Sequence, residues 1–161
     1  MEEKRRIERF NRLDDQMTPA QVARRRFKST FPRKAPKSTP TAMQAMAKVM
    51  ELLDQFRGEQ SALGLDPNDV SAGLVYLEGE DQHTAELPAP EKVGSFVEEI
   101  MALDKPQFLG VLFIQTDREA KRPDQRYTLF CWPFMGGPDA EKRLLIARHR
   151  QQAKTWNATQ N

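Results

Sequence analysis

The sequence predicts an α+β domain. Its small antiparallel sheet, of about three strands, carries helices on one face and follows a basic helical N-terminal arm. Apolar residues at helical spacing alternate along the chain with short apolar runs of strand length. Two of these runs, 108–114 and 127–134, flank a polar turn and predict one long antiparallel hairpin, 108–134. A proline-rich stretch separates this pattern from the N-terminus, so the sequence divides into an arm and one domain.

The arm begins with a narrow apolar stripe. Ile7, Phe10 and Leu13 recur at three-residue spacing, which predicts a short helix within residues 3–16. The rest of that surface is charged, so such a helix is marginal by itself and needs something to lie against. We therefore expect the stripe to dock on a protein surface.

A second short helix and a linker complete the arm. Thr18-Pro19 supplies an N-cap and a proline at the first helical position, which predicts a basic helix through about Phe27. Between Ser29 and Thr41, three prolines stand among Ser, Thr and Lys and exclude a helix or a central strand. The predicted segments are 1–38 for the basic arm and linker, 39–156 for the domain, and 157–161 for a polar tail.

Within the domain, each element has its own signal. Thr39-Pro40 repeats the capping signal before a long helix that ends near Phe56 and carries a broad apolar face. An acidic stretch from Glu78 to Pro90 predicts a loop with at most a short edge strand, near His83 to Leu87. The remaining predictions are a strand at 74–77, an amphipathic helix at 91–103, the hairpin at 108–134, and a last helix that starts after Gly136-Gly137.

Composition excludes several classes of protein. The chain of 161 residues fits one domain, and no apolar run approaches the roughly 20 residues needed to cross a bilayer. The charged N-terminus does not resemble a secretory signal, so we expect a cytoplasmic protein. One cysteine, Cys131, excludes an internal disulfide, and with only His83 and His149 beside it we expect no metal site and no cofactor.

Charge is strongly segregated along the chain. Residues 1–40 hold twelve Lys/Arg and five Asp/Glu, whereas residues 51–104 hold two and thirteen. Residues 105–161 hold ten Lys/Arg and five Asp/Glu, so the overall charge of +2 conceals basic ends and an acidic middle. Such separation favours electrostatic binding to a partner.

The basic arm is the first candidate binding site. Its cationic side chains can neutralise phosphates or an acidic protein surface, while the aromatic ring stacks or wedges. The alternatives are a solvated basic tail and a contact with the acidic middle of the same chain. The candidate residues are Arg24, Arg25, Arg26, Phe27, Lys28, Arg33, Lys34 and Lys37.

The hairpin tip is the second candidate. Arg118, Arg122 and Arg126 lie in the polar turn of the hairpin, and with the basic end of the last helix (148–154) they could form a further cationic surface. An ordinary solvated turn explains the same residues equally well.

Catalytic signals are weak. Cys131 lies in an apolar strand, where a thiol is usually buried and inert. Carboxylates around His83 fit no calcium-loop spacing, and Gly136-Gly137 lacks the Lys and Ser/Thr of a phosphate-binding loop.

We therefore predict a non-enzymatic accessory protein. Its arm would contact nucleic acid or a ribonucleoprotein, while its domain docks on a protein partner or on itself. The alternative is a structural or regulatory subunit of a viral or bacterial assembly, with the arm docked on a neighbouring protein.

Overall fold

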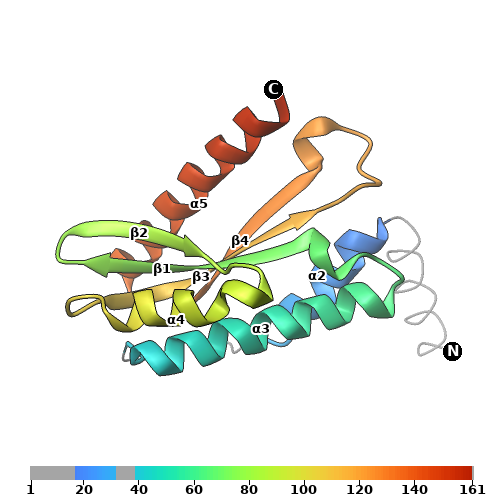
Figure 1. Cartoon of the computed structure of the whole chain (residues 1–161). Coiled ribbons are helices and arrows are strands. Elements are labelled where there is room, and N and C mark those ends of the chain that lie inside the picture. The colour runs from blue at the N-terminus through green and yellow to red at the C-terminus, as the bar shows by residue number, and fades with distance from the viewer. Residues whose placement is uncertain (1–16, 32–38, 161) are drawn as a thin grey trace, which may run out of the picture.

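A four-stranded antiparallel sheet lies between two unequal helical layers (Figure 1). The computed structural model describes residues 17–31 and 39–160, with side chains as far as Thr155. The strands are β1 (Val70–Glu78), β2 (Asp81–Glu86), β3 (Gln107–Thr116) and β4 (Tyr127–Pro133), in the spatial order β2-β1-β3-β4. The helices are α2 (Pro19–Lys28), α3 (Ala42–Ala62), α4 (Val93–Met101) and α5 (Pro138–Gln160). The predicted α+β class is confirmed.

The helices cover both faces of the sheet, and the expectation of one covered face is wrong. Val111 and Phe113 of β3 pack into the core with α2, α3 and α4, whereas Leu109 and Leu112 pack with Leu144 of α5 on the other side. A strand that is apolar on both faces needs cover on both, because either face left in water would expose a row of large side chains.

The sheet has four strands because a polar segment adds one edge. β2 pairs antiparallel with β1 through a turn at Gly79, whose φ of 64° suits glycine. Five of the six β2 residues are polar or charged, and none is buried, so the segment lacks the apolar alternation that predicts a strand. The predicted long hairpin is confirmed, with β3 and β4 paired from Gly110↔Pro133 to Thr116↔Tyr127.

Capping boxes start α2 and α3. The predicted Thr18-Pro19 start of α2 is confirmed, whereas the predicted Thr39-Pro40 start of α3 is wrong, because its N-cap is Thr41. Thr18 accepts from the backbone N–H of Gln21 and Thr41 from that of Gln44, while each glutamine side chain accepts from the backbone N–H of its threonine. These bonds satisfy amides that have no partner within the helix. α3 extends beyond the predicted end near Phe56 and ends before Gly64, whose φ is 73°.

Helix α2 belongs to the folded core and not to a separate arm. Ala20, Ala23 and Phe27 are buried, and the Phe27 ring stacks on Phe56 of α3 at a centroid distance of 4.5 Å. The core thus extends N-terminal to the predicted boundary at residue 39. Residues 1–16 and 32–38 lie outside the described part of the chain, and with them the predictions for Ile7, Phe10, Leu13, Arg33, Lys34 and Lys37.

Within the described ranges, none of the helices combines the length and the apolar character that crossing a bilayer requires.

Candidate functional site

A groove of about 350 Å³ runs beside β4, the last strand of the sheet. We call it the β4 groove. Helix α2 and the residues that follow it form one wall, and α5 forms the other. Phe130, Cys131 and Pro133 of β4 form the floor. Because the two helices pack on opposite faces of the sheet, the strand edge lies between them.

The α5 wall follows from the helix period. Ala140, Leu144 and Ala147 are buried against the sheet, so the neighbouring side of the helix faces the groove. That side carries Glu141, Leu145 and Arg148, at spacings of four and three. Leu145 is 46% exposed and lines the groove between Glu141 and Arg148 along the helix.

The α2 wall brings a cation and an aromatic ring to the same edge. Lys28 Nζ lies 5.1 Å from the centroid of the Phe130 ring. Phe31, just after α2, lies 6.2 Å from the same ring, centroid to centroid, and is only partly buried. The groove therefore has Lys28 on one wall, Arg148 on the other, and an accessible aromatic ring beside them. One acid, Glu141, also lines it.

Cys131 lies in the floor, and its chemistry argues against a nucleophile. Burial raises the pKa of its thiol to about 11, and the nearby positive charge of Arg148 opposes this rise only in part. The Sγ atom is 3.7 Å from the Leu144 carbonyl oxygen, which accepts its weak hydrogen bond. The thiol is therefore protonated at neutral pH, whereas a nucleophilic cysteine needs a thiolate.

This raised pKa predicts the reactivity of the native protein. The rate of alkylation of Cys131 by iodoacetamide should rise with pH about a midpoint near 11, against 9.0 for an unperturbed thiol in the urea-unfolded chain. Since the native state holds the proton longer, its stability should fall as the pH rises from 9.0 to about 11. A native midpoint at or below 9 would contradict a buried, inert thiol.

Two of the predicted binding residues serve the fold. Phe27 has no exposed surface and contacts the rings of Phe56 and Phe113, so it has no face on which a base could stack. Arg24 donates from Nη1 to Oε1 of Gln115 at 3.1 Å. Gln115, fully buried, donates in turn to the Ala20 carbonyl and to Gln60, both at 2.8 Å. Burial lowers the pKa of Arg24, although Asp117 opposes the change.

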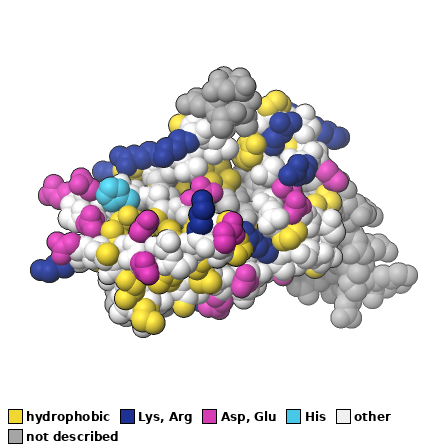
Figure 2. Space-filling model, viewed as in Figure 1, with side chains coloured by type: hydrophobic (Ala, Val, Ile, Leu, Met, Phe, Trp, Pro, Cys, Tyr) yellow, Lys and Arg dark blue, Asp and Glu magenta, His cyan; other side chains and the backbone are white. Residues whose placement is uncertain are grey.

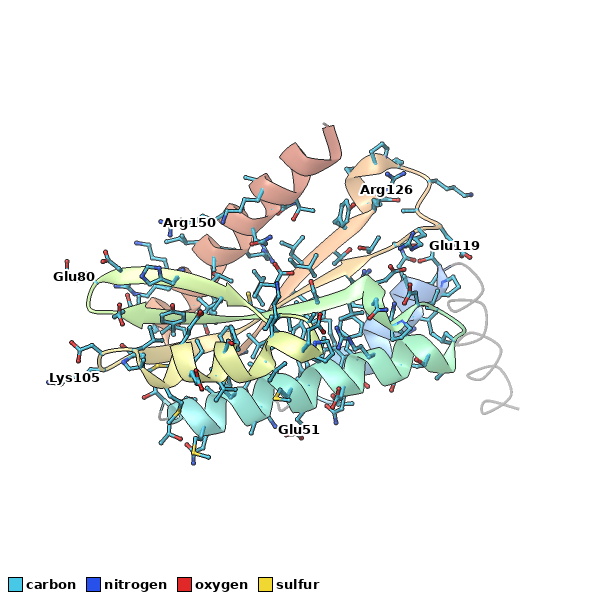
Figure 3. All side chains as sticks on the ribbon, viewed as in Figure 1. Glu51, Glu80, Lys105, Glu119, Arg126 and Arg150 are labelled. Atoms are coloured by element: carbon cyan, nitrogen blue, oxygen red, sulfur yellow. The ribbon has the colours of Figure 1, made fainter. Side chains whose placement is uncertain are left out.

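The other cationic candidates lie at the surface. Arg25, Arg26 and Lys28 are exposed on α2. At the hairpin tip, Arg118 binds both carboxylate oxygens of Asp69, at 2.8 and 2.9 Å, and this hydrogen bond raises its pKa. The same tip also holds Arg122, which pairs with Asp124 at 3.1 Å, and Arg126, which is exposed. In Figure 3, Arg126 and Arg150 of α5 lie on the upper side of the molecule, away from Glu51 on α3.

No protein-family model, curated protein or solved structure matches this chain.

The acidic stretch contributes no site of its own. His83 contacts the Tyr76 ring at 5.4 Å between centroids, and the carboxylates around it are exposed. Among the residues that the structure describes, no three His, Cys, Asp or Glu side chains come together as metal ligands. Gly137, with φ of 118°, forms the turn into α5.

The sequence did not predict that Lys28 and Arg148 line the same groove, or that Phe31 lies beside them. These residues are far apart in the chain, and only the packing of α2 and α5 at one strand edge brings them together. One signal was available: Glu141, Leu145 and Arg148 follow the helix period, and Leu145 interrupts an otherwise polar side of α5.

Proposed function

We propose that this protein binds single-stranded nucleic acid, free or within a ribonucleoprotein, at the β4 groove and without catalysing a reaction on it. The observation that carries the proposal is the placement of Lys28 and Arg148 on opposite walls of a groove that Phe31 also lines. Proteins that bind single strands combine such cations, which track the phosphates, with aromatic rings on which bases stack.

The size of the groove favours a single strand. Its volume of about 350 Å³ is small, and we expect it to admit a base or a sugar-phosphate unit rather than a duplex. Lys28 and Arg148 would each neutralise a phosphate, and Phe31 would take over the stacking role that the sequence assigned to Phe27. Arg26, two residues before Lys28 on α2, is exposed as well.

The chemistry of the floor supports binding without catalysis. Among the described residues that line the groove, Cys131 is held as a neutral thiol and Glu141 is the single carboxylate. Nucleophilic catalysis by a cysteine needs an activated thiolate.

The test is a fluorescence-anisotropy titration of labelled oligothymidine and oligouridine with the full chain, at several salt concentrations. Each phosphate contact to a single strand contributes ~0.7 to the slope of log K against log salt, so two contacts predict a slope of about −1.4 or steeper. The affinity should then fall at least about sevenfold between about 50 and about 200 mM salt. A duplex of the same length should bind more weakly. Absent binding, or binding that salt does not weaken, would favour the alternative of a subunit docked on other proteins.

A further inference from the structure

Toward the β2 edge of the sheet, opposite the β4 groove, α3 and the chain leading into α4 form a second hollow that the proposed function does not use. A cavity of about 360 Å³ lies between Met50 and Arg57 of α3, Asn68, and the segment from Leu87 to Val93 that leads into α4. In Figure 2, hydrophobic side chains gather with acidic ones along the lower part of the face shown, where α3 and α4 lie.

Methionines continue this hollow along both helices. Met43 lies seven residues before Met50 on the same side of α3, and Met101 lies eight residues after Val93 on the same side of α4. Three of the exposed large hydrophobic residues are Met43, Met50 and Met101, at 71%, 41% and 52%. We name the hollow and these flanks the α3–α4 furrow. Flexible thioether side chains suit a surface that receives an apolar helix.

Two acids, Asp54 and Glu98, lie along the furrow. Asp54 lines the cavity one turn beyond Met50 on α3. Glu98 is exposed on α4, three residues before Met101, and is therefore its neighbour on the helix surface. Arg57 lines the same cavity, and apart from Met43 and Met50 the furrow belongs to the segment 51–104, which holds thirteen Asp/Glu and two Lys/Arg. Electrostatic complementarity thus favours a helix with an apolar stripe and basic flanks.

We propose that residues 1–16 of this same chain dock in cis on the α3–α4 furrow, with Ile7, Phe10 and Leu13 against its methionines. The segment provides the stripe that the sequence analysis left without a surface. Residues 1–16 hold five Lys/Arg and five Asp/Glu, and all five cations fall within residues 4–12. Only this central part of the segment therefore complements the acids along the furrow. Docking would also remove the exposed apolar surface of both parts from water.

The attachment point of the segment allows this contact. Thr18 donates from Oγ1 to Asp117 at 2.7 Å, and the next residue, Arg118, holds Asp69, which adjoins Asn68 of the cavity. The chain before Met17 therefore starts near one end of the furrow. Sixteen residues reach roughly 24 Å as a helix and more than twice that when extended, enough to follow the furrow.

The cavity also holds a polar group that an occupant can satisfy. Nε of Arg57 is buried and has no hydrogen-bond acceptor among the described residues. Such a donor is costly to leave unpaired. A carbonyl or carboxylate oxygen of the docked segment would supply the acceptor.

The test uses the full chain labelled with [methyl-¹³C]methionine, whose seven methionines give seven NMR signals. Ile7→Asp with Phe10→Asp should shift the signals of Met43, Met50 and Met101. Met135 packs with the cluster on the α5 side, so its signal should stay and reports that the fold is intact. The matched control, Asn11→Asp with Gln16→Asp, adds the same charge away from the stripe and should leave all three furrow signals unshifted.

Three results would overturn the proposal. If the furrow signals stay in place in the stripe variant, residues 1–16 do not lie there. If they move equally in the control, the added charge alone is the cause. If they depend on protein concentration in the wild type, a second copy is the occupant. Each readout is independent of nucleic-acid binding, so failure here leaves the proposed function untouched.

Discussion

Replacing Phe27 with alanine should lower the free energy of unfolding by about 3–5 kcal/mol, as is usual when a buried phenylalanine is truncated. The ring has no exposed surface and lies 4.5 Å from Phe56, 5.1 Å from Phe113 and 5.1 Å from Phe31, measured between centroids. No described neighbour can fill the space of a whole ring without leaving its own contacts. The loss would be a large fraction of the stability of an ordinary domain.

Urea unfolding followed by circular dichroism measures this change, with Phe31→Ala as the matched control. The control removes the same atoms from a ring that is only partly buried, so its cost should be less than half as large. If Phe27→Ala cost less than about 1 kcal/mol, far below the range for a buried ring, α2 would not be part of the core. The prediction of a separable arm from residue 1 to 38 would then regain support.

Gly110→Ala should destabilise the fold by about 3 kcal/mol, the upper end of the usual range for overpacking. A Cβ atom at this position of β3 would lie 2.5 Å from the Trp132 carbonyl oxygen and 3.2 Å from Pro133 Cα. Both belong to the backbone of β4 and cannot rotate away. It would also lie 3.0 Å from Cδ2 of Leu144, the residue that holds α5 against the sheet.

Gly58→Ala is the control for Gly110→Ala. Gly58 lies within α3, and a Cβ atom there would meet nothing within 4 Å, so alanine should be neutral or stabilise by up to about 1 kcal/mol through its helix propensity. Urea unfolding of both variants gives the comparison. Equal stabilities for the two variants would show that β3, β4 and α5 do not approach one another as closely as the structure indicates.

The sequence predicts local structure well here because the relevant signals are local. The Thr18-Pro19 start of α2 and the apolar runs on either side of the hairpin turn are complete within a few residues. The start of α3 was displaced by two residues, because Thr41 and not Thr39 is its N-cap. β2 was predicted only as a short edge strand within a loop, because its residues are polar and its stability comes from pairing with β1. The sequence did not predict the position of α5 either, because periodicity identifies the apolar side of a helix but not the sheet face that this side covers.

The site was predictable only in its charges. Lys28 stands in the cationic arm and Arg148 in the basic end of the last helix, and both were visible as such. Phe27 and Phe31 are indistinguishable in sequence, since each is an aromatic residue near basic ones; tertiary packing buries the first and leaves the second at the groove. Arg24 resembled its neighbours, yet its partner Gln115 lies on a distant strand.

The central claim is that Lys28 and Arg148 together form the binding site, and the same oligonucleotide titration tests it on paired variants. Lys28→Gln with Arg148→Gln should lower the salt slope by about 1.4 and weaken binding at about 50 mM salt at least about tenfold, because two phosphate contacts are lost. The control, Lys92→Gln with Lys105→Gln, removes two exposed charges next to α4 and should retain the wild-type slope. Equal slopes for the two double variants would contradict the account.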